Sequence, residues 1–405
     1  MIAANMFGSF MRIALLACSP IARDSRVLKT SATLSKQGHE VSVAGYGDAP
    51  LGLDARMIAL SEPQPTTSHR LKTALTRLPA NIAPPLALPL HARSRGHRQL
   101  IDALRLIKPD IIHANDWPTL PAAIAYKRET GCRVLYDSHE FAQAEHEERL
   151  YWRLVSQRFV RAVEGSQIGE ADAVTTVSEG IADALHESYG LIKRPTVIAN
   201  YPRFELHRSK PAGDVLQLLF HGLLTRSRGI ERLIQATKLI QRPVVLTIRG
   251  NGAPGYVTAL KAQAEASGDR VRFEPAVAPS AVVSAASTAD IGFVLPNPGS
   301  RQFNFSMPNK LFEYIMAGLA VVTGHGRDMN QLMARTGCGF ATAATTPAAL
   351  AAEVDALTSA SIDDAKARST VAARTLSWDA QEPTLLAIYD LLAAQVSPSR
   401  RQQTV

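Results

Sequence analysis

Residues 306–322 read Ser-Met-Pro-Asn-Lys-Leu-Phe-Glu-Tyr-Ile-Met-Ala-Gly-Leu-Ala-Val-Val. Pro308 and Gly318 bracket a helix of about ten residues, because proline is favoured in the first turn of a helix and glycine just past its end. The apolar segment Ala320–Thr323 follows at once and predicts a buried strand. A short helix that leads directly into an apolar strand is typical of an α/β fold with a parallel sheet.

Apolar segments of strand length alternate with helical patterns along the 405 residues, in two series. The expected strands of the first series lie at residues 13–17, 41–44, 110–113, 133–136, 173–177 and 196–199, and those of the second at 216–220, 244–249, 271–273, 290–295 and 320–323. Apolar strands separated by helices indicate parallel sheets covered on both faces. The chain is also too long for one ordinary core. We therefore predict two doubly wound, Rossmann-like α/β domains that face each other across a cleft.

The domain boundary is predicted where the alternation stops, in the polar stretch Tyr201–Asp214. This gives a first domain over residues 1–203 and a second over residues 204–381. The tail at 382–397 has helical spacing of its apolar residues, and we expect it to pack back on the first domain. Ser178, directly after an expected strand, is well placed as a helix N-cap.

The composition indicates a folded globular protein, with 46% hydrophobic and 20% charged residues. Three widely separated cysteines predict neither a disulfide framework nor a metal cluster, which favours a reducing cytoplasm. No run of apolar residues is long enough to span a membrane. The apolar run before Cys18 is too short for a signal peptide, so we interpret it as the first strand, with Met11 as an alternative start to Met1.

Positive charge is concentrated between Arg56 and Lys108, where nine Lys or Arg face only two carboxylates, out of a net charge of +8. No aromatic residues interleave with these cations and no nucleic-acid motif is present, so an anionic membrane or an anionic acceptor fits better. Within this stretch, His69–Leu78 has leucines on one face and cations around them. It fits either an ordinary surface helix or a membrane-interface helix. Arg149–Arg161 is a second such candidate, but we interpret its apolar residues as core.

Tandem α/β domains are common among dinucleotide enzymes, but the fingerprint for that class is missing. Residues 18–24, after the first strand, read Cys-Ser-Pro-Ile-Ala-Arg-Asp and contain no glycine. Gly250 and Gly252 follow another strand, yet the third glycine is absent. A turn that needs small residues explains this pair as well as a ligand site does.

The stretch 220–229, Phe-His-Gly-Leu-Leu-Thr-Arg-Ser-Arg-Gly, resembles a phosphate cradle. It turns at Gly222 and carries Arg226 and Arg228 to the start of a helix. Fixed guanidinium groups and the free N–H groups of a helix N-terminus suit a diphosphate. The alternative is a solvated loop that contains arginine.

Lys310 and Glu313 are three residues apart and therefore share one face of the predicted helix. Beside a strand end, they offer a cation for a phosphate and a carboxylate for the vicinal hydroxyls of a ribose. Taken alone, Lys310 and Glu313 fit an ordinary surface ion pair better than a ligand site.

Taken together in their order, these motifs resemble those of a family 4 glycosyltransferase of the GT-B fold, in the branch with an NKLFEY…AG donor motif. The resemblance covers most of the chain. The matching pieces are Asp24–Val27, Gly38–Val41, His113–Trp117, Tyr136–Glu140, Val177–Gly180, Arg228–Gly229 and Asn309–Gly318.

The resemblance implies a retaining transfer from an NDP-sugar, with no cofactor and no metal at the reaction centre. It implies that Arg228 contacts phosphate and that Glu313 binds the ribose. It also implies that His139 lies near the sugar, with Asp116 at the acceptor, although His139 alone fits a hydrogen-bonded strand-end histidine. The predicted catalytic residues are thus His139 and Asp116, and the predicted donor-binding residues are Gly222, Arg226, Arg228, Gly250, Ser306, Asn309, Lys310 and Glu313.

Two positions depart from the family pattern. Many relatives have arginine directly after the first glycine of the loop, where this chain has Leu223, so we expect Arg226 to supply that charge. Phe305 stands where the first glutamate of the E-x7-E pattern is often found. Recognition of the sugar then falls to other groups, such as the backbone around Ser306–Met307.

We therefore expect a glycosyltransferase of cell-surface polysaccharide biosynthesis, acting on a glycan or lipid-linked acceptor at the cytoplasmic face of a membrane. Two alternatives stay open. A GT-B-fold NDP-sugar epimerase would interconvert free NDP-sugars, and a scaffold protein would bind a nucleotide sugar without turnover. The residues do not specify the base, the sugar, the acceptor or the linkage.

Overall fold

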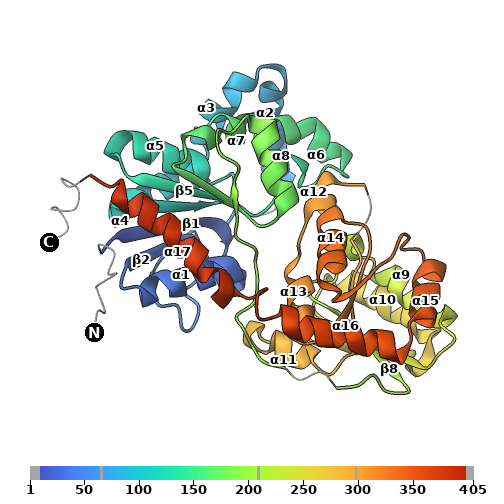
Figure 1. The fold of residues 1–405 in the computed structure, drawn as a ribbon. Helices are drawn as coiled ribbons and strands as arrows, with labels where there is room; N and C mark the ends of the chain where they lie inside the picture. Colours follow the sequence, from blue (N-terminus) through green and yellow to red (C-terminus); the bar gives the residue numbers. More distant parts are fainter. Residues whose placement is uncertain (1–9, 64–66, 208–209, 297–298, 398–405) are drawn as a thin grey trace, which may run out of the picture. The chain divides into compact units, whose positions relative to one another are not determined.

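The computed structural model describes residues 10–63, 67–207, 210–296 and 299–397, with the backbone alone for residues 67–71. The chain divides into two compact units (Figure 1). The first unit contains residues 1–199 and 382–405, and the second contains residues 200–381. Each unit is built around one parallel sheet with helices, which confirms the predicted pair of doubly wound α/β domains.

The first unit has a seven-stranded parallel sheet with the strand order β3-β2-β1-β4-β5-β6-β7. Its strands are β1 (Arg12–Pro20), β2 (Glu40–Tyr46), β3 (Arg56–Leu60), β4 (Ile111–Asn115), β5 (Arg133–Ser138), β6 (Ala173–Thr176) and β7 (Thr196–Val197). The strand order reverses between β1 and β4. At such a switch point the flanking loops diverge, and ligands bind at the carboxyl ends of the strands.

Nine α-helices with described bounds belong wholly or partly to the first unit. They are α1 (Ser25–Lys36), α2 (Thr67–Ile82), α3 (Ala87–Ala92), α4 (Arg95–Ile107), α5 (Leu120–Thr130), α6 (Leu150–Val155), α7 (Gln157–Gly165), α8 (Glu179–Tyr189) and α17 (Trp378–Ala394). Ser178 caps α8 by accepting a hydrogen bond from the backbone of Ile181 at 3.2 Å, as its sequence position predicts.

The second unit has a six-stranded parallel sheet with the order β10-β9-β8-β11-β12-β13. Its strands are β8 (Leu216–His221), β9 (Val244–Arg249), β10 (Val271–Glu274), β11 (Ile291–Val294), β12 (Ala320–Thr323) and β13 (Gly339–Ala341). Its helices include α9 (Ile230–Leu239), α10 (Pro254–Glu265), α11 (Val282–Ala286), α12 (Arg301–Phe305), α13 (Asn309–Met316), α14 (Arg327–Thr336), α15 (Pro347–Ala356) and α16 (Ser359–Ala372). The sequence patterns missed β3 and β13, because these short edge strands have few fully buried residues.

The unit boundary lies between residues 199 and 200, four residues before the predicted one. Residues 200–203 pack on the second unit, where the Tyr201 ring lies 4.6 Å from that of Phe312 and the Pro202 carbonyl accepts a hydrogen bond from Trp378. The C-terminal part of α17 belongs to the first unit, where the Tyr389 hydroxyl lies 2.7 Å from Nδ1 of His113. No helix among the described residues has the length and hydropathy needed to cross a membrane.

A buried carboxyl group lies in the core of the first unit. Glu164 of α7 has no exposed surface and accepts hydrogen bonds from the hydroxyl groups of Tyr136 and Tyr189, at 2.5 and 2.7 Å. Burial raises the pKa of Glu164 to about 7. The folded chain therefore keeps a proton on Glu164 at pH values where the unfolded chain releases it.

We predict that Glu164→Gln removes a pH-dependent loss of stability. The raised pKa makes the wild type less stable as pH rises from about 4.5 to about 7, by a total of about 3 kcal/mol. The free energy of unfolding of Glu164→Gln should therefore rise relative to that of the wild type over this interval, whereas the control Glu179→Gln, at an exposed site, should not show this rise. Urea unfolding at pH 5 and pH 8 measures the difference, and an equal effect at both pH values would contradict the prediction.

Candidate functional site

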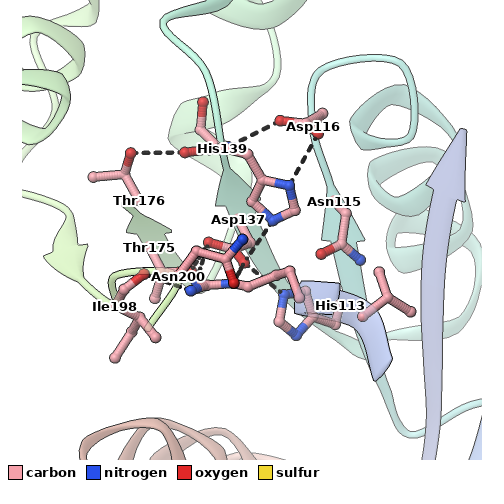
Figure 2. A network of polar contacts seen from close by, with 12 residues as sticks. His113, Asn115, Asp116, Asp137, His139, Thr175, Thr176, Ile198 and Asn200 are labelled. Carbon is pink, nitrogen blue, oxygen red and sulfur yellow. Dashed lines mark hydrogen bonds and ion pairs between the residues drawn. The ribbon is translucent and has the colours of Figure 1, made fainter. Parts of the chain in front are cut away.

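In the first unit, two predicted catalytic residues meet at the carboxyl ends of β4 and β5 (Figure 2). Asp116 directly follows β4 and has a positive φ of 60°, which is uncommon for a residue other than glycine. Its backbone N–H donates to the Asp137 carbonyl at 2.9 Å. Its carboxylate in turn accepts a hydrogen bond from the backbone N–H of His139, also at 2.9 Å. The turn therefore fixes Asp116 against the residue that follows β5.

The imidazole of His139 lies between two carboxylates. Its Nδ1 is 3.2 Å from Oδ2 of Asp116, and its Nε2 is 3.0 Å from Oδ2 of Asp137. Burial disfavours the charged ring, but the two carboxylates outweigh it and raise the pKa of His139 well above its ordinary value. His139 is therefore a cation at neutral pH, oriented by partners on both nitrogens.

Asp137 is the centre of this network and is fully buried. Arg26 of α1 donates to both of its oxygens, from Nε at 2.8 Å and Nη2 at 2.9 Å. Thr175 of β6 donates at 2.8 Å, and Nε2 of His113 lies 3.3 Å away. Burial opposes the charge of Asp137, yet Arg26 and His139 hold its pKa well below the usual range. Arg26 and Asp137 are not among the predicted site residues, although both stand inside the motifs DSRV and DSHE.

A cavity of about 180 Å³ lies at the switch point of the first sheet, at the ends of β1 and β4. Its lining is Ala17, Cys18, Ser19, Asp24, Asn115, Asp116, Trp117, Pro118, Glu140, Ala142 and Glu145. Four of these residues are carboxylates and none is Lys or Arg. The cavity therefore favours neutral or cationic groups that bear hydrogen-bond donors, and disfavours anions.

In the second unit, two cations converge on Gly222 at the end of β8. A Cβ atom built on Gly222 would lie 3.8 Å from the Nζ of Lys310 and 3.9 Å from Nη1 of Arg228. Gly222 has a φ of 113°, which other residues adopt only with strain. The glycine therefore leaves the backbone accessible between a lysine from the first turn of α13 and an arginine from the following loop.

Lys310 is a buried cation, with 6% of its surface exposed. Its Nζ lies 3.6 Å from the centre of the Phe220 ring, and no carboxylate among the described residues lies within 4.0 Å of it. Burial and the nearby charge of Arg228 lower the pKa of Lys310 well below its usual range, against the opposing effect of Glu313. A desolvated ammonium without a paired anion is costly, and a bound anion offsets that cost.

Glu313 lies one turn further along α13, with its Oε2 2.8 Å from Nε2 of His221. The helix is held in place by Tyr314, whose hydroxyl accepts a hydrogen bond from the His221 backbone at 2.9 Å. The ring of Tyr314 also lies on Gly292 of β11, where a Cβ atom would come within 2.4 Å of it. These contacts fix α13 against β11 and place Lys310 and Glu313 beside the end of β8.

Two other predicted donor-binding residues, Arg226 and Asn309, have different neighbours. Arg226 is exposed, lies 3.7 Å from Glu231 and stacks over the ring of Tyr256 at 5.1 Å. The structure therefore does not bring Arg226 to Lys310, because Arg228 is the arginine of this loop that faces Gly222. Asn309 begins α13 and accepts a hydrogen bond from Asn200 at 2.8 Å.

The remaining two donor predictions have local structural reasons. Ser306 follows the last residue of α12, and its hydroxyl donates to the Phe303 carbonyl at 3.3 Å. A Cβ atom on Gly250 would lie 1.9 Å from the Gly222 carbonyl oxygen, so close packing of the two loops requires glycine there. Phe305 stacks with the guanidinium of Arg327 at 4.9 Å. Among the described residues, no group of three or more His, Cys, Asp or Glu is arranged to hold a metal ion.

Comparison with known proteins supports the resemblance seen in the motifs. Residues 25–201 match the family model described as Glycosyltransferase Family 4, and residues 216–360 match the one described as Glycosyl transferases group 1. Glycogen synthase of Mycobacterium tuberculosis is 28% identical over 172 residues, which span 39% of this chain and 41% of that enzyme. The match thus covers less than half of that curated relative.

Solved structures share the fold at low identity. Sucrose-phosphate synthase from Thermosynechococcus elongatus has a TM-score of 0.72 at 17% identity, covering 94% of this chain and 99% of that one. Anabaena HepE, in complex with UDP and glucose, has a TM-score of 0.69 at 14% identity, covering 94% and 99%. Both likenesses confirm the predicted two-domain fold.

We predict that the imidazole of His139 stays protonated through neutral pH, whereas that of His91, with a pKa lowered to about 4 by burial, stays neutral. Asp116→Asn should lower the pKa of His139, because one of its two carboxylate partners is lost. The ¹⁵N chemical shifts of the imidazole nitrogens, followed as a function of pH, measure the protonation of both histidines and the effect of Asp116→Asn on His139. The stability that protonated His139 contributes is complete below about pH 6.5 and is lost as pH rises through its raised value. Titration of His139 near 6.5 in the wild type would contradict this prediction.

Proposed function

Since the chain belongs to glycosyltransferase family 4 and has the GT-B fold, we propose that it is a retaining transferase that moves a sugar from a nucleoside diphosphate sugar to an acceptor hydroxyl. The observation that carries the proposal is the buried Lys310 ammonium, which has Arg228 nearby and no paired carboxylate among the described residues. This arrangement lacks one component, an anion of high charge density.

A nucleoside diphosphate supplies that anion. In the proposed complex, its phosphate oxygens lie over Gly222, between Lys310 and Arg228. The N–H groups at the start of α13 add a favourable dipole. Glu313 accepts hydrogen bonds from the ribose hydroxyls, in a position set by His221. The complex of HepE with UDP and glucose supports a nucleotide of this kind.

The two cations also account for the proposed chemistry without a metal ion. When the bond between the sugar and the diphosphate breaks, negative charge grows on the leaving oxygen. Lys310 is already buried and Arg228 lies beside it, so the two cations stabilise that charge with little reorganisation. The backbone around Ser306–Met307 is proposed to hold the sugar, because Phe305 provides no carboxylate there.

The acceptor is proposed to bind in the cavity of the first unit. The four carboxylates of the cavity accept hydrogen bonds from sugar hydroxyls and repel an anionic group. The reacting end of the acceptor is therefore proposed to be a neutral glycan unit. Asp116 lines the cavity, and the charged imidazole of His139 balances its negative charge. We place the enzyme in the cytoplasm, at the inner face of the membrane, in polysaccharide biosynthesis on a glycan or lipid-linked acceptor.

The donor site is tested with Lys310→Gln, matched by Lys238→Gln at the exposed end of α9. Loss of one charge-assisted contact should weaken UDP binding roughly ten- to hundredfold. The same change should raise stability without ligand, because it removes a buried, unpaired charge. Calorimetric titration with UDP and thermal unfolding with and without UDP measure the two opposite effects. Equal UDP affinity of both variants would refute the proposed diphosphate site.

Turnover is tested with UDP-glucose as the first donor of a panel, and with His139→Ala. We expect kcat for transfer or donor hydrolysis to fall about hundredfold, whereas the Kd for UDP stays unchanged, since Lys310 and Arg228 hold the nucleotide. The anomeric proton couplings of the product report its configuration, and an inverted product would contradict retention. New NDP-sugars without acceptor would indicate an epimerase, and binding without any turnover would indicate a scaffold.

A further inference from the structure

Two neighbouring helices of the first unit expose a group of large apolar side chains. Three lie on α2 and three on α6, and we call them the α2–α6 surface. The exposed fractions are 64% for Leu75, 45% for Leu78, 90% for Ile82, 61% for Leu150, 52% for Tyr151 and 60% for Leu154. Single exposed leucines are ordinary on a protein surface, but a contiguous apolar group marks a contact site.

The exposure of α6 contradicts, for this part of the segment, the prediction that the apolar residues of Arg149–Arg161 belong to the core. The core residues begin only with Val155, and Phe159 and Val160 of α7 are buried after it. Leu150, Tyr151 and Leu154 of α6 are instead exposed, whereas Trp152 packs against the core. Periodicity alone did not separate the two, because both helices alternate apolar residues with arginine.

Polar contacts connect α2 to α6, to α7 and to Ser156 between them. Arg77 of α2 donates to the Ser156 hydroxyl at 2.8 Å, and the Asn81 side chain donates to the Leu154 carbonyl at 2.5 Å. Arg158 donates back to the Asn81 carbonyl at 3.3 Å. Helices α2, α6 and α7 therefore pack side by side (Figure 1). Leu71, predicted on the same stripe of α2, lies outside the described side chains.

Cations accompany the apolar side chains, and carboxylates are absent from both segments. Residues 63–101 contain six Lys or Arg and no Asp or Glu, and residues 149–163 contain four Arg and no Asp or Glu. Arg149 lies 3.3 Å from Glu148, just outside the second segment. Exposed Lys72, Arg153 and Arg161 have no ion pair among the described residues. Each cation near an anionic lipid surface contributes about 1 kcal/mol of attraction.

We propose that the α2–α6 surface docks on an anionic lipid bilayer, with its leucine, isoleucine and tyrosine side chains below the headgroups and its cations among them. This proposal rests on the proposed function, and it names the surface through which the transferase reaches a membrane-bound acceptor. A protein partner of this chemistry would need an apolar face surrounded by carboxylates. A bilayer of anionic lipid offers both an apolar interior and negatively charged headgroups, over a surface of any size.

The position of the surface relative to the cavity supports a lipid-linked acceptor. Trp117 lines the cavity, and the Arg77 guanidinium of α2 lies 5.7 Å from its ring. His146, next to the cavity residue Glu145, contacts the Trp152 ring of α6 at 5.0 Å. Helix α2 thus contacts a residue of the cavity wall, and α6 contacts the neighbour of another. The lipid phosphate would remain beside the cations of the surface, and the neutral sugar would enter the acidic cavity.

The test measures co-flotation of the full chain with vesicles of pure phosphatidylcholine, and of phosphatidylcholine with about one-third phosphatidylglycerol, at low and high salt. The double variant Ile82→Gln/Leu154→Gln removes two anchors. Its matched control is Leu391→Gln, which changes a leucine of α17 that is 66% exposed. A charge variant, Lys72→Gln/Arg153→Gln, is compared with the exposed Arg272→Gln of the second unit.

We expect binding to the anionic vesicles only, weakened by salt. Binding should fall on the order of tenfold or more in the double apolar variant, and both controls should bind as the wild type does. Absence of binding to anionic vesicles, or wild-type binding by the double variant, would overturn the proposal. A wild-type dimer that this variant dissociates would also overturn it, since the partner would then be a second copy. UDP affinity measured on the same samples separates the two proposals. Absence of vesicle binding with intact UDP binding contradicts only the proposed docking surface, whereas absence of UDP binding refutes the proposed donor site.

Discussion

The buried ion pair between Arg26 and Asp137 organises the first unit. A carboxylate without solvent contact is stable only if its charge is matched and its oxygens are hydrogen-bonded. Asp137 meets this requirement through Arg26, Thr175, His113 and His139, which come from α1, β6, β4 and the end of β5. Arg26 also donates to the carbonyls of Ile198 and Ala199, and His113 contacts Tyr389. The same pair therefore fixes the orientation of His139 and connects it to α17.

The second unit uses the opposite arrangement. Its buried ion is a cation, and no described carboxylate pairs with Lys310. In the first unit the protein supplies every partner for the buried charge, which makes the network rigid. In the second unit a partner has to come from outside, so part of the cost of burying Lys310 is offset only when an anion binds. Rigidity in one unit and an unmatched charge in the other suit a catalytic network and a donor site respectively.

Charge in the first unit is separated between the cavity and the α2–α6 surface. The cavity has carboxylates and no Lys or Arg, whereas the two helical segments beside it have arginines and no carboxylates. Trp117 and the pair of His146 and Trp152 lie between these regions. A ligand with a neutral polar end and an anionic lipid end matches this separation.

The sequence by itself determined the elements that depend on local physics. Runs of apolar residues gave the strands from β8 to β12, Ser178 gave the start of α8, and Pro308 with Gly318 gave α13, whose first residue is Asn309. Motif order also indicated the family. These inferences succeed because strand periodicity and helix caps are set by neighbours within a few residues.

Only the tertiary structure decided which groups meet. Asp137 and Arg26 are 111 residues apart, so nothing local distinguishes their ion pair from two ordinary charged residues. Arg226 and Arg228 stand two positions apart, yet one faces Glu231 and the other faces Gly222, because both lie in one short 3-10 helix, where side chains two positions apart point in different directions. Likewise, α6 exposes leucines that its sequence pattern assigns to the core. Partners and burial depend on contacts between distant segments, and those exist only in the folded chain.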